Sequence, residues 1–143
     1  MRKNTIESVQ ELCGYIPYFE NINPESAAQW EGGQKLNDGT FTMSYPRYEK
    51  EFLEFIDAFY SGSLLELELN YANVIQQKVP DWHGADKHKV VETADFELLK
   101  AILTACIRGE HFCDGAWIEP IKNGLFLCIL QRLNVLLTNN KTI

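Results

Sequence analysis

Residues 125–137 constrain the fold of this 143-residue chain more than any other segment. Apolar residues occupy almost every position, and only Gln131, Arg132 and Asn134 interrupt them. This pattern predicts a helix that is apolar on nearly all sides. Such a helix needs cover from other elements, so it is either the central helix of the domain or part of an oligomer interface. We favour the central position, and the interface stays the alternative.

Apolar residues at helical spacing predict that most of the remaining chain is helical as well. Further helices are predicted at residues 4–16, 46–61, 64–77 and 94–108, with a short one at 114–121. Asn4 and Glu7 form a capping box at the first helix, and Thr93 is the expected N-cap of the fourth. Pro46 suits the first position of the second helix. The apolar stripe of that helix contains Tyr48, Phe52, Phe55, Ile56 and Phe59.

Two segments are predicted not to be helical. Residues 34–43 read as a short β-hairpin, because Asn37, Asp38 and Gly39 form a turn between two short extended segments. A helical turn is expected before it, at residues 27–30, and a loop at residues 78–92. The sequence therefore predicts a mainly α fold, a compact bundle of about five helices with a small hairpin, in a single domain over residues 1–143.

Charge and composition narrow the classes of partner. The formal net charge is −7 and the sequence pI about 4.9. An acidic surface repels phosphate backbones and anionic lipids, so nucleic-acid binding is not expected. No apolar run approaches the length of a membrane span, and no signal-peptide pattern follows Met1, so we expect a cytoplasmic protein without membrane contact. The four cysteines form no Cys-x-x-Cys pair and are interpreted as thiols.

Residues 108–117, Arg-Gly-Glu-His-Phe-Cys-Asp-Gly-Ala-Trp, concentrate polar and aromatic groups between two predicted helices. One interpretation is structural: Gly109 is a left-handed C-cap, Asp114 caps the next helix, and Phe112 and Trp117 are buried. The other is a ligand pocket. Its candidate residues are Arg108, Glu110, His111, Asp114 and Trp117.

Each candidate in this pocket has a chemical role that suits its type. Arg108 would bind an anion in bidentate fashion. Glu110 or Asp114 would act as a general base, and His111 as a general acid or base near neutral pH. Cys113 would need a lowered thiol pKa and an orienting partner to act as a nucleophile, and the sequence identifies no such partner.

The same motif carries a resemblance to a known family. Residues 107–115 and Trp117 resemble a family of small bacterial proteins, domain of unknown function 6508. Trp30 and residues 45–55 are similar to the N-terminal half of that family, so the resemblance extends over most of the chain. His111 stands where the family commonly has arginine, which argues against an essential charge there. The resemblance implies a small, mainly helical protein and provides no catalytic residue to transfer.

No metal site or cofactor is predicted. His83, Asp86 and His88 lack a recognised ligand spacing, and the glycine patterns that bind phosphates and dinucleotides are absent. The leading hypothesis is a non-enzymatic protein-interaction module whose partner is another protein or a second copy of the chain. The alternative is a small enzyme or ligand-binding protein with a polar pocket at residues 108–117. A third hypothesis, an acidic mimic of DNA, requires the acids of residues 49–68 to form one extended face.

Overall fold

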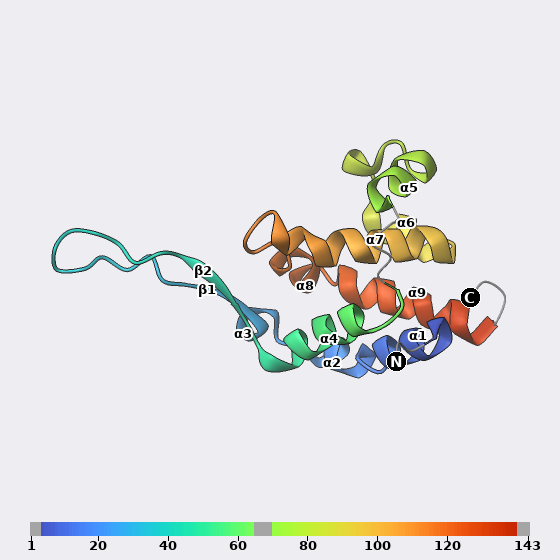
Figure 1. Cartoon of the computed structure of the whole chain (residues 1–143), viewed down its shortest axis with the longest axis horizontal. Helices are drawn as coiled ribbons and strands as arrows, with labels where there is room; N and C mark the ends of the chain where they lie inside the picture. The colour runs from blue at the N-terminus through green and yellow to red at the C-terminus, as the bar shows by residue number, and fades with distance from the viewer. Residues whose placement is uncertain (1–3, 65–69, 140–143) are drawn as a thin grey trace.

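The computed structural model describes residues 4–64 and 70–139. It consists of a body of packed helices and a long β-hairpin that extends away from that body (Figure 1). The prediction of a mainly α fold with a small hairpin is therefore confirmed. The helix predicted at residues 64–77 has a different start among the described residues, because Leu64 is not helical and the observed helix begins at Tyr71 after its N-cap Asn70. Residues 65–69, which include Glu66 and Glu68 of the acidic segment, lie outside the described residues.

The central helix is α9 (Leu125–Asn139), as the apolar segment predicts. It packs against α1 (Thr5–Cys13), α2 (Ile16–Asn21), α6 (Lys87–Thr93), α7 (Phe96–Arg108) and α8 (Ile118–Lys122). Phe126, Ile129 and Leu130 are completely buried, whereas Val135 remains 44% exposed on the outer side. Among the residues that the structure describes, no helix is both long and apolar enough to cross a membrane.

A cluster of aromatic rings joins α9 to α4 (Lys50–Ser61). Phe126 contacts Phe52 and Phe55 at ring-centroid distances of 5.7 and 5.6 Å, and Phe19 of α2 completes the cluster. The predicted helical stripe is thus correct for its phenylalanines. It is wrong for Tyr48, because the helix begins at Lys50 and not at Pro46. Pro46 lies in an extended strand, which its fixed φ angle and missing N–H allow at a sheet edge.

The helix predicted at residues 4–16 begins at the expected cap but ends at Cys13, and α2 follows it. The N–H of Glu7 donates to Oδ1 of Asn4 at 2.8 Å, and Nδ2 of Asn4 donates to the Glu7 carboxylate at 3.0 Å. The helical turn expected at residues 27–30 is wrong. The turn comes earlier, as α3 (Pro24–Ala27), and strand β1 (Ala28–Glu31) follows it directly.

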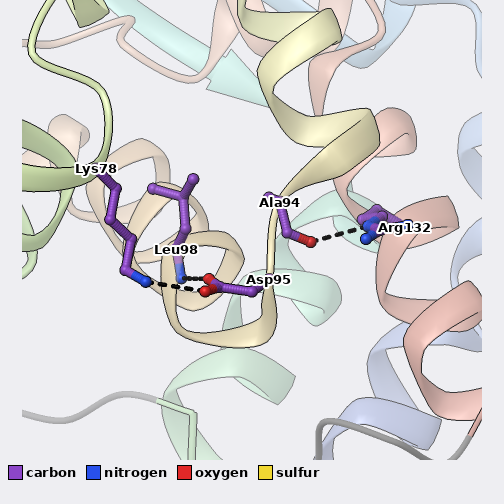
Figure 2. Close-up of polar contacts among 5 residues, drawn as sticks. All are labelled: Lys78, Ala94, Asp95, Leu98 and Arg132. Atoms are coloured by element: carbon purple, nitrogen blue, oxygen red, sulfur yellow. Dashed lines mark hydrogen bonds and ion pairs between the residues drawn. The ribbon is translucent and has the colours of Figure 1, made fainter.

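The predicted loop at residues 78–92 is also largely wrong. It contains a 3₁₀ turn, η1 (Trp82–Gly84), and helix α6, and it follows α5 (Tyr71–Lys78). Thr93 ends α6, and the N-cap of α7 is Asp95, which accepts a hydrogen bond from the N–H of Leu98 at 2.9 Å (Figure 2). The same carboxylate pairs with Nζ of Lys78 from α5, also at 2.9 Å.

The hairpin, which we call the arm (residues 28–48), consists of β1 paired antiparallel with β2 (Tyr45–Tyr48) and of the chain between them. Ala28 lies opposite Tyr48, and Glu31 lies opposite Tyr45. Beyond this ladder, Lys35 and Phe41 form a further bridge. The hairpin predicted at residues 34–43 is therefore the tip of a longer one (Figure 1).

Candidate functional site

Of residues 108–117, Arg108 ends α7 and residues 109–117 form the connection to α8, at the base of the arm. The connection contains a 3₁₀ turn, η2 (Gly109–His111). Gly109 has a φ of −54°, so the predicted left-handed cap at this position is wrong. The left-handed glycine is Gly115, with a φ of 87°. A Cβ on Gly115 would lie 2.5 Å from Cζ2 of Trp30, so the absence of a side chain there lets the Trp30 ring sit directly on the turn.

Glu110 connects the arm to this turn. Its carboxylate accepts hydrogen bonds from the hydroxyl of Tyr48 at 2.8 Å, the N–H of Gly115 at 2.8 Å and the N–H of Trp117 at 3.1 Å. Burial and the Glu110 carboxylate raise the pKa of Tyr48 well above the ordinary tyrosine value. Tyr48 therefore stays protonated and donates to Glu110 throughout the physiological range.

Trp117 provides the apolar part of the same contact. Its indole Nε1 donates to the carbonyl oxygen of Ile107 at 2.8 Å, which fixes the ring against the end of α7. The ring lies 5.0 Å from that of Tyr48 and 5.5 Å from that of Phe52, between centroids. We call Glu110, Gly115 and Trp117 the arm seat, because together they hold Tyr48 and Trp30 of the arm.

The other three candidate residues point to different parts of the molecule. The Arg108 guanidinium lies 5.8 Å from the centre of the Tyr71 ring of α5. Nε2 of His111 lies 3.3 Å from the hydroxyl of Tyr60 on α4. Asp114 is exposed, and its predicted role as a helix cap is wrong, because α8 begins at Ile118 and Trp117 occupies its N-cap position without a side-chain hydrogen bond. The predicted burial of Phe112 is also wrong, because its side chain is 76% exposed.

The structure thus brings Glu110 and Trp117 together around Tyr48 and turns Arg108 and His111 toward other helices. Whether the five residues bind a ligand stays a prediction. The structural interpretation of the motif has direct support at Glu110, whose two oxygens are both engaged by donors of the protein itself.

The cysteines divide into one exposed thiol and three shielded ones. Cys113, in the connection, is exposed, and all four cysteines are free thiols. Burial raises the pKa of Cys13 to about 11 and that of Cys106 to about 12. Burial also raises the pKa of Cys128. Because the thiolate is the reactive form, these three side chains behave as small apolar groups at neutral pH.

His83 and His88, the two histidines of residues 78–92, have different surroundings. Nε2 of His88 lies 2.9 Å from the carbonyl oxygen of Asn123, whereas His83 lines a cavity of about 390 Å³ with Tyr71 and Trp82. Within residues 4–64 and 70–139, no group of three or more His, Cys, Asp or Glu side chains is placed to hold a metal ion.

Sequence reasoning missed the exposed apolar side chains of the arm. Met43 is 84% exposed, Phe41 65%, Trp30 54% and Tyr45 50%. A signal was present, because Phe41, Met43 and Tyr45 alternate with Thr42 and Ser44, which is the pattern of a strand with one apolar face. In an ordinary sheet that face would be covered by a core. Here the four side chains are exposed on an arm that extends beyond the helical body (Figure 1).

Comparison with known protein families finds a match over most of the chain. A family described as "Family of unknown function (DUF6508)" matches residues 4–139. The chain belongs to this family. No curated protein and no solved structure matches the chain. The DUF6508 match confirms the resemblance carried by the motif at residues 107–117, and it spans both the arm and the arm seat.

Proposed function

We propose that this chain is a non-enzymatic protein-interaction module whose docking element is the arm. The observation that carries the proposal is that Trp30, Leu36, Phe41, Met43 and Tyr45, most of the large apolar side chains that are exposed, gather on a hairpin that projects from the helical body. Exposed apolar groups gathered on one element are typical of protein–protein contact sites. Phe41, Met43 and Tyr45 belong to the residue types that are enriched in such contacts.

The arm seat supports this proposal. A two-stranded hairpin is at best marginally stable on its own in water. The contacts of Tyr48 and Trp30 with Glu110, Gly115 and Trp117 fix the base of the arm on the body. A hairpin that is anchored at its base and uncovered along its length presents its side chains in a defined position. Anchoring lowers the entropy cost of binding a partner.

The charge distribution also supports a protein partner. The arm contains two acidic residues, Glu31 and Asp38, and two basic residues, Lys35 and Arg47, so its formal charges cancel. The net charge of −7 therefore belongs to the rest of the chain. A neutral, aromatic arm suits an apolar protein surface and offers no attraction to nucleic acid or to anionic lipid. A cytoplasmic location, where the thiols would stay reduced, is part of this proposal.

The test is site-specific photo-cross-linking. A photoreactive phenylalanine analogue at position 41 reports on the arm, and the same analogue at Val135, exposed on α9, is the matched control. We expect discrete protein adducts from position 41, none of them from position 135, and their loss when Met43→Lys is added. The adduct is then rebuilt from the purified chain and the identified purified partner. Equal adducts from both positions, or no adduct from position 41, would contradict the proposal.

A further inference from the structure

We infer that the cavity between α5, η1 and α7 binds a small aromatic molecule that carries a negative charge, with an aromatic carboxylate as the simplest member of that class. We call this cavity, of about 390 Å³, the α5 pocket. It lies where α5 packs on α7, on the side of α7 that faces away from the central helix α9 (Figure 1). The inference goes beyond the proposed function, because it concerns a different surface and a different class of ligand.

The α5 pocket has the size and the lining of a small-molecule site. Ligand pockets in proteins typically measure about 300–1,000 Å³ and are lined mostly by apolar and aromatic side chains with a few polar groups. The polar groups here come from Gln76 and His83. The rest of the lining is apolar or aromatic and includes Tyr71, Ile75, Val79, Pro80, Trp82 and Ala105. The volume is at the lower end of the usual range, so a small ligand fits it best.

Two aromatic side chains from different elements favour a ligand with a planar ring. Tyr71 is the first residue of α5, and Trp82 is the first residue of η1. The backbone of Trp82 is fixed, because its N–H donates to the carbonyl oxygen of Val79 at 3.0 Å and its own carbonyl accepts from Nζ of Lys87 at 3.1 Å. Aromatic rings attract one another in offset-stacked and edge-to-face arrangements, so an aromatic ligand gains contacts here that an aliphatic one lacks.

Each of these two rings is accompanied by a cation. Nζ of Lys87 lies 4.8 Å from the centre of the Trp82 ring, and the Arg108 guanidinium lies 5.8 Å from that of the Tyr71 ring. Within the described part of the chain, neither cation forms an ion pair with a carboxylate. Because each ring already holds a cation, a cationic ligand would be repelled, whereas an anionic ligand would be attracted.

Acidic side chains are kept out of the α5 pocket. Among the described residues, its lining contains no aspartate or glutamate, although the chain has 20 of them and a net charge of −7. Asp81, which precedes Trp82, is exposed and is not part of the lining. Three cavities on or beside the arm, by contrast, are each lined by one glutamate: Glu25, Glu31 or Glu49. An anion can therefore occupy the α5 pocket without a carboxylate against it.

Cinnamate, a planar aromatic carboxylate, is the probe that tests this inference. Cinnamamide keeps the ring without the charge, and hexanoate keeps the charge without the ring. The chain has three tryptophans, so proton–nitrogen correlation spectra of the indole N–H groups report on three places at once. Trp82 reports on the α5 pocket, Trp30 on the arm and Trp117 on the arm seat, and single Trp→Phe variants assign the signals.

We expect cinnamate to shift the Trp82 signal with a Kd below about 1 mM and to leave the signals of Trp30 and Trp117 in place. Cinnamamide should bind about fivefold more weakly or less well still, because it is not attracted by Lys87 and Arg108. Hexanoate should also bind more weakly, because it cannot stack on Tyr71 or Trp82.

Gln76 and Gln77 provide a matched pair of variants. Both side chains are exposed on α5, but of the two only Gln76 lines the pocket. Gln76→Glu places a negative charge beside the bound anion, so it should weaken cinnamate binding by about fivefold and leave cinnamamide binding unchanged. Gln77→Glu adds the same charge to the same helix and should change cinnamate binding by less than about twofold. Circular dichroism checks that both variants keep their helices.

Four results would overturn the inference. These are no shift of the Trp82 signal at about 5 mM cinnamate, equal shifts at all three tryptophans, equal binding of cinnamate and cinnamamide, and equal effects of Gln76→Glu and Gln77→Glu. The proposed function is tested separately by the cross-linking experiment at position 41. Each claim can therefore fail while the other holds, because the arm contributes no residue to the α5 pocket.

Discussion

The helical body and the arm are stabilised in opposite ways. The body surrounds α9 with helices on several sides, and the rings of Phe19, Phe52, Phe55 and Phe126 contact one another inside it. The arm has no such core, and its large side chains are exposed from Trp30 to Tyr45. Polar contacts to Glu110 and ring contacts to Trp117 hold its base. This difference indicates that global stability resides in the body and that the arm is positioned by a few residues.

The largest effect is expected for Phe126→Ala. Phe126 is completely buried and contacts three other phenylalanine rings, so its removal leaves a cavity between α9 and α4. We expect a loss of about 3–5 kcal/mol in the free energy of unfolding, measured by chemical denaturation. Val135→Ala on the same helix is the control and should change stability by about 0.5 kcal/mol or less. Equal losses from the two variants would show that α9 is not the centre of the body.

A smaller effect is expected for Glu110→Ala. The substitution leaves the N–H groups of Gly115 and Trp117 and the hydroxyl of Tyr48 without their acceptor. We expect a loss of about 1–3 kcal/mol in the free energy of unfolding, and about 1 kcal/mol for Tyr48→Phe, which removes only one hydrogen bond.

Amide hydrogen exchange shows where the Glu110→Ala effect is located. Exchange in the β1–β2 ladder should accelerate more than exchange in α1, because Glu110 holds the base of the arm. Acceleration that is uniform over the chain would contradict a specific link between Glu110 and the arm.

Asp95→Ala tests a polar contact of the body that does not involve the arm. Asp95 caps α7 and pairs with Lys78, while Nε of Arg132 donates to the carbonyl of neighbouring Ala94 at 2.9 Å (Figure 2). Loss of the cap should cost about 1 kcal/mol, because the side chain is more than half exposed. Lys78→Met removes the ion pair and keeps the cap, so its effect should be smaller.

Acid titration tests how the contribution of Asp95 to the free energy of unfolding depends on pH. The Lys78 ammonium and the N–H of Leu98 lower the pKa of Asp95 in the folded chain. Its stabilising contribution is therefore present above the ordinary aspartate pKa near 4 and is lost as the pH falls through the lowered value. The stability difference between the unaltered chain and Asp95→Ala should thus disappear at strongly acidic pH.

The smallest effect on global stability is expected for Gly32→Ala, although its local effect is large. Gly32 has a φ of 82°, and an added Cβ would lie 1.9 Å from the carbonyl oxygen of Met43. The arm beyond the ladder must therefore rearrange, and exchange at the N–H groups of Gly33 and Thr42 should accelerate. Because the part of the arm beyond the ladder contributes no buried side chain to the core, the free energy of unfolding should change by about 1 kcal/mol or less.

Gly39→Ala is the matched control for this variant. Gly39 also has a positive φ, of 88°, but an added Cβ would have open space around it. We expect a smaller local change at Gly33 and Thr42 than in Gly32→Ala. A large loss of global stability in either variant would show that the arm is part of the folding core.

Several helices could be predicted from the sequence because their signals are local. The capping box of Asn4 and Glu7, the spacing of Phe52, Phe55 and Phe59, and the apolar run at residues 125–137 depend on neighbours within one or two turns. The boundaries that failed depend on competition between adjacent residues. Asp95 rather than Thr93 caps α7, because the chain leaves α6 at Thr93 and only Asp95 reaches the N–H of Leu98.

The strand at Tyr45–Tyr48 could not be distinguished from a helix start by local signals. Pro46 and Tyr48 fit either state, and the strand exists because Ala28–Glu31 pairs with it across the arm. The motif at residues 108–117 likewise gave two interpretations of the same side chains. Only the folded chain shows that Glu110 accepts a hydrogen bond from Tyr48, which is 62 positions away in the sequence.

The sequence by itself therefore determined a mainly helical protein with a central apolar helix, a hairpin and an acidic charge, since these follow from periodicity, turn residues and composition. The tertiary structure decided where the hairpin begins, that it stands away from the body and that the motif at residues 108–117 holds its base. The physical reason is that strand pairing and side-chain hydrogen bonds between distant segments depend on which surfaces the helices leave uncovered, and no local pattern encodes this.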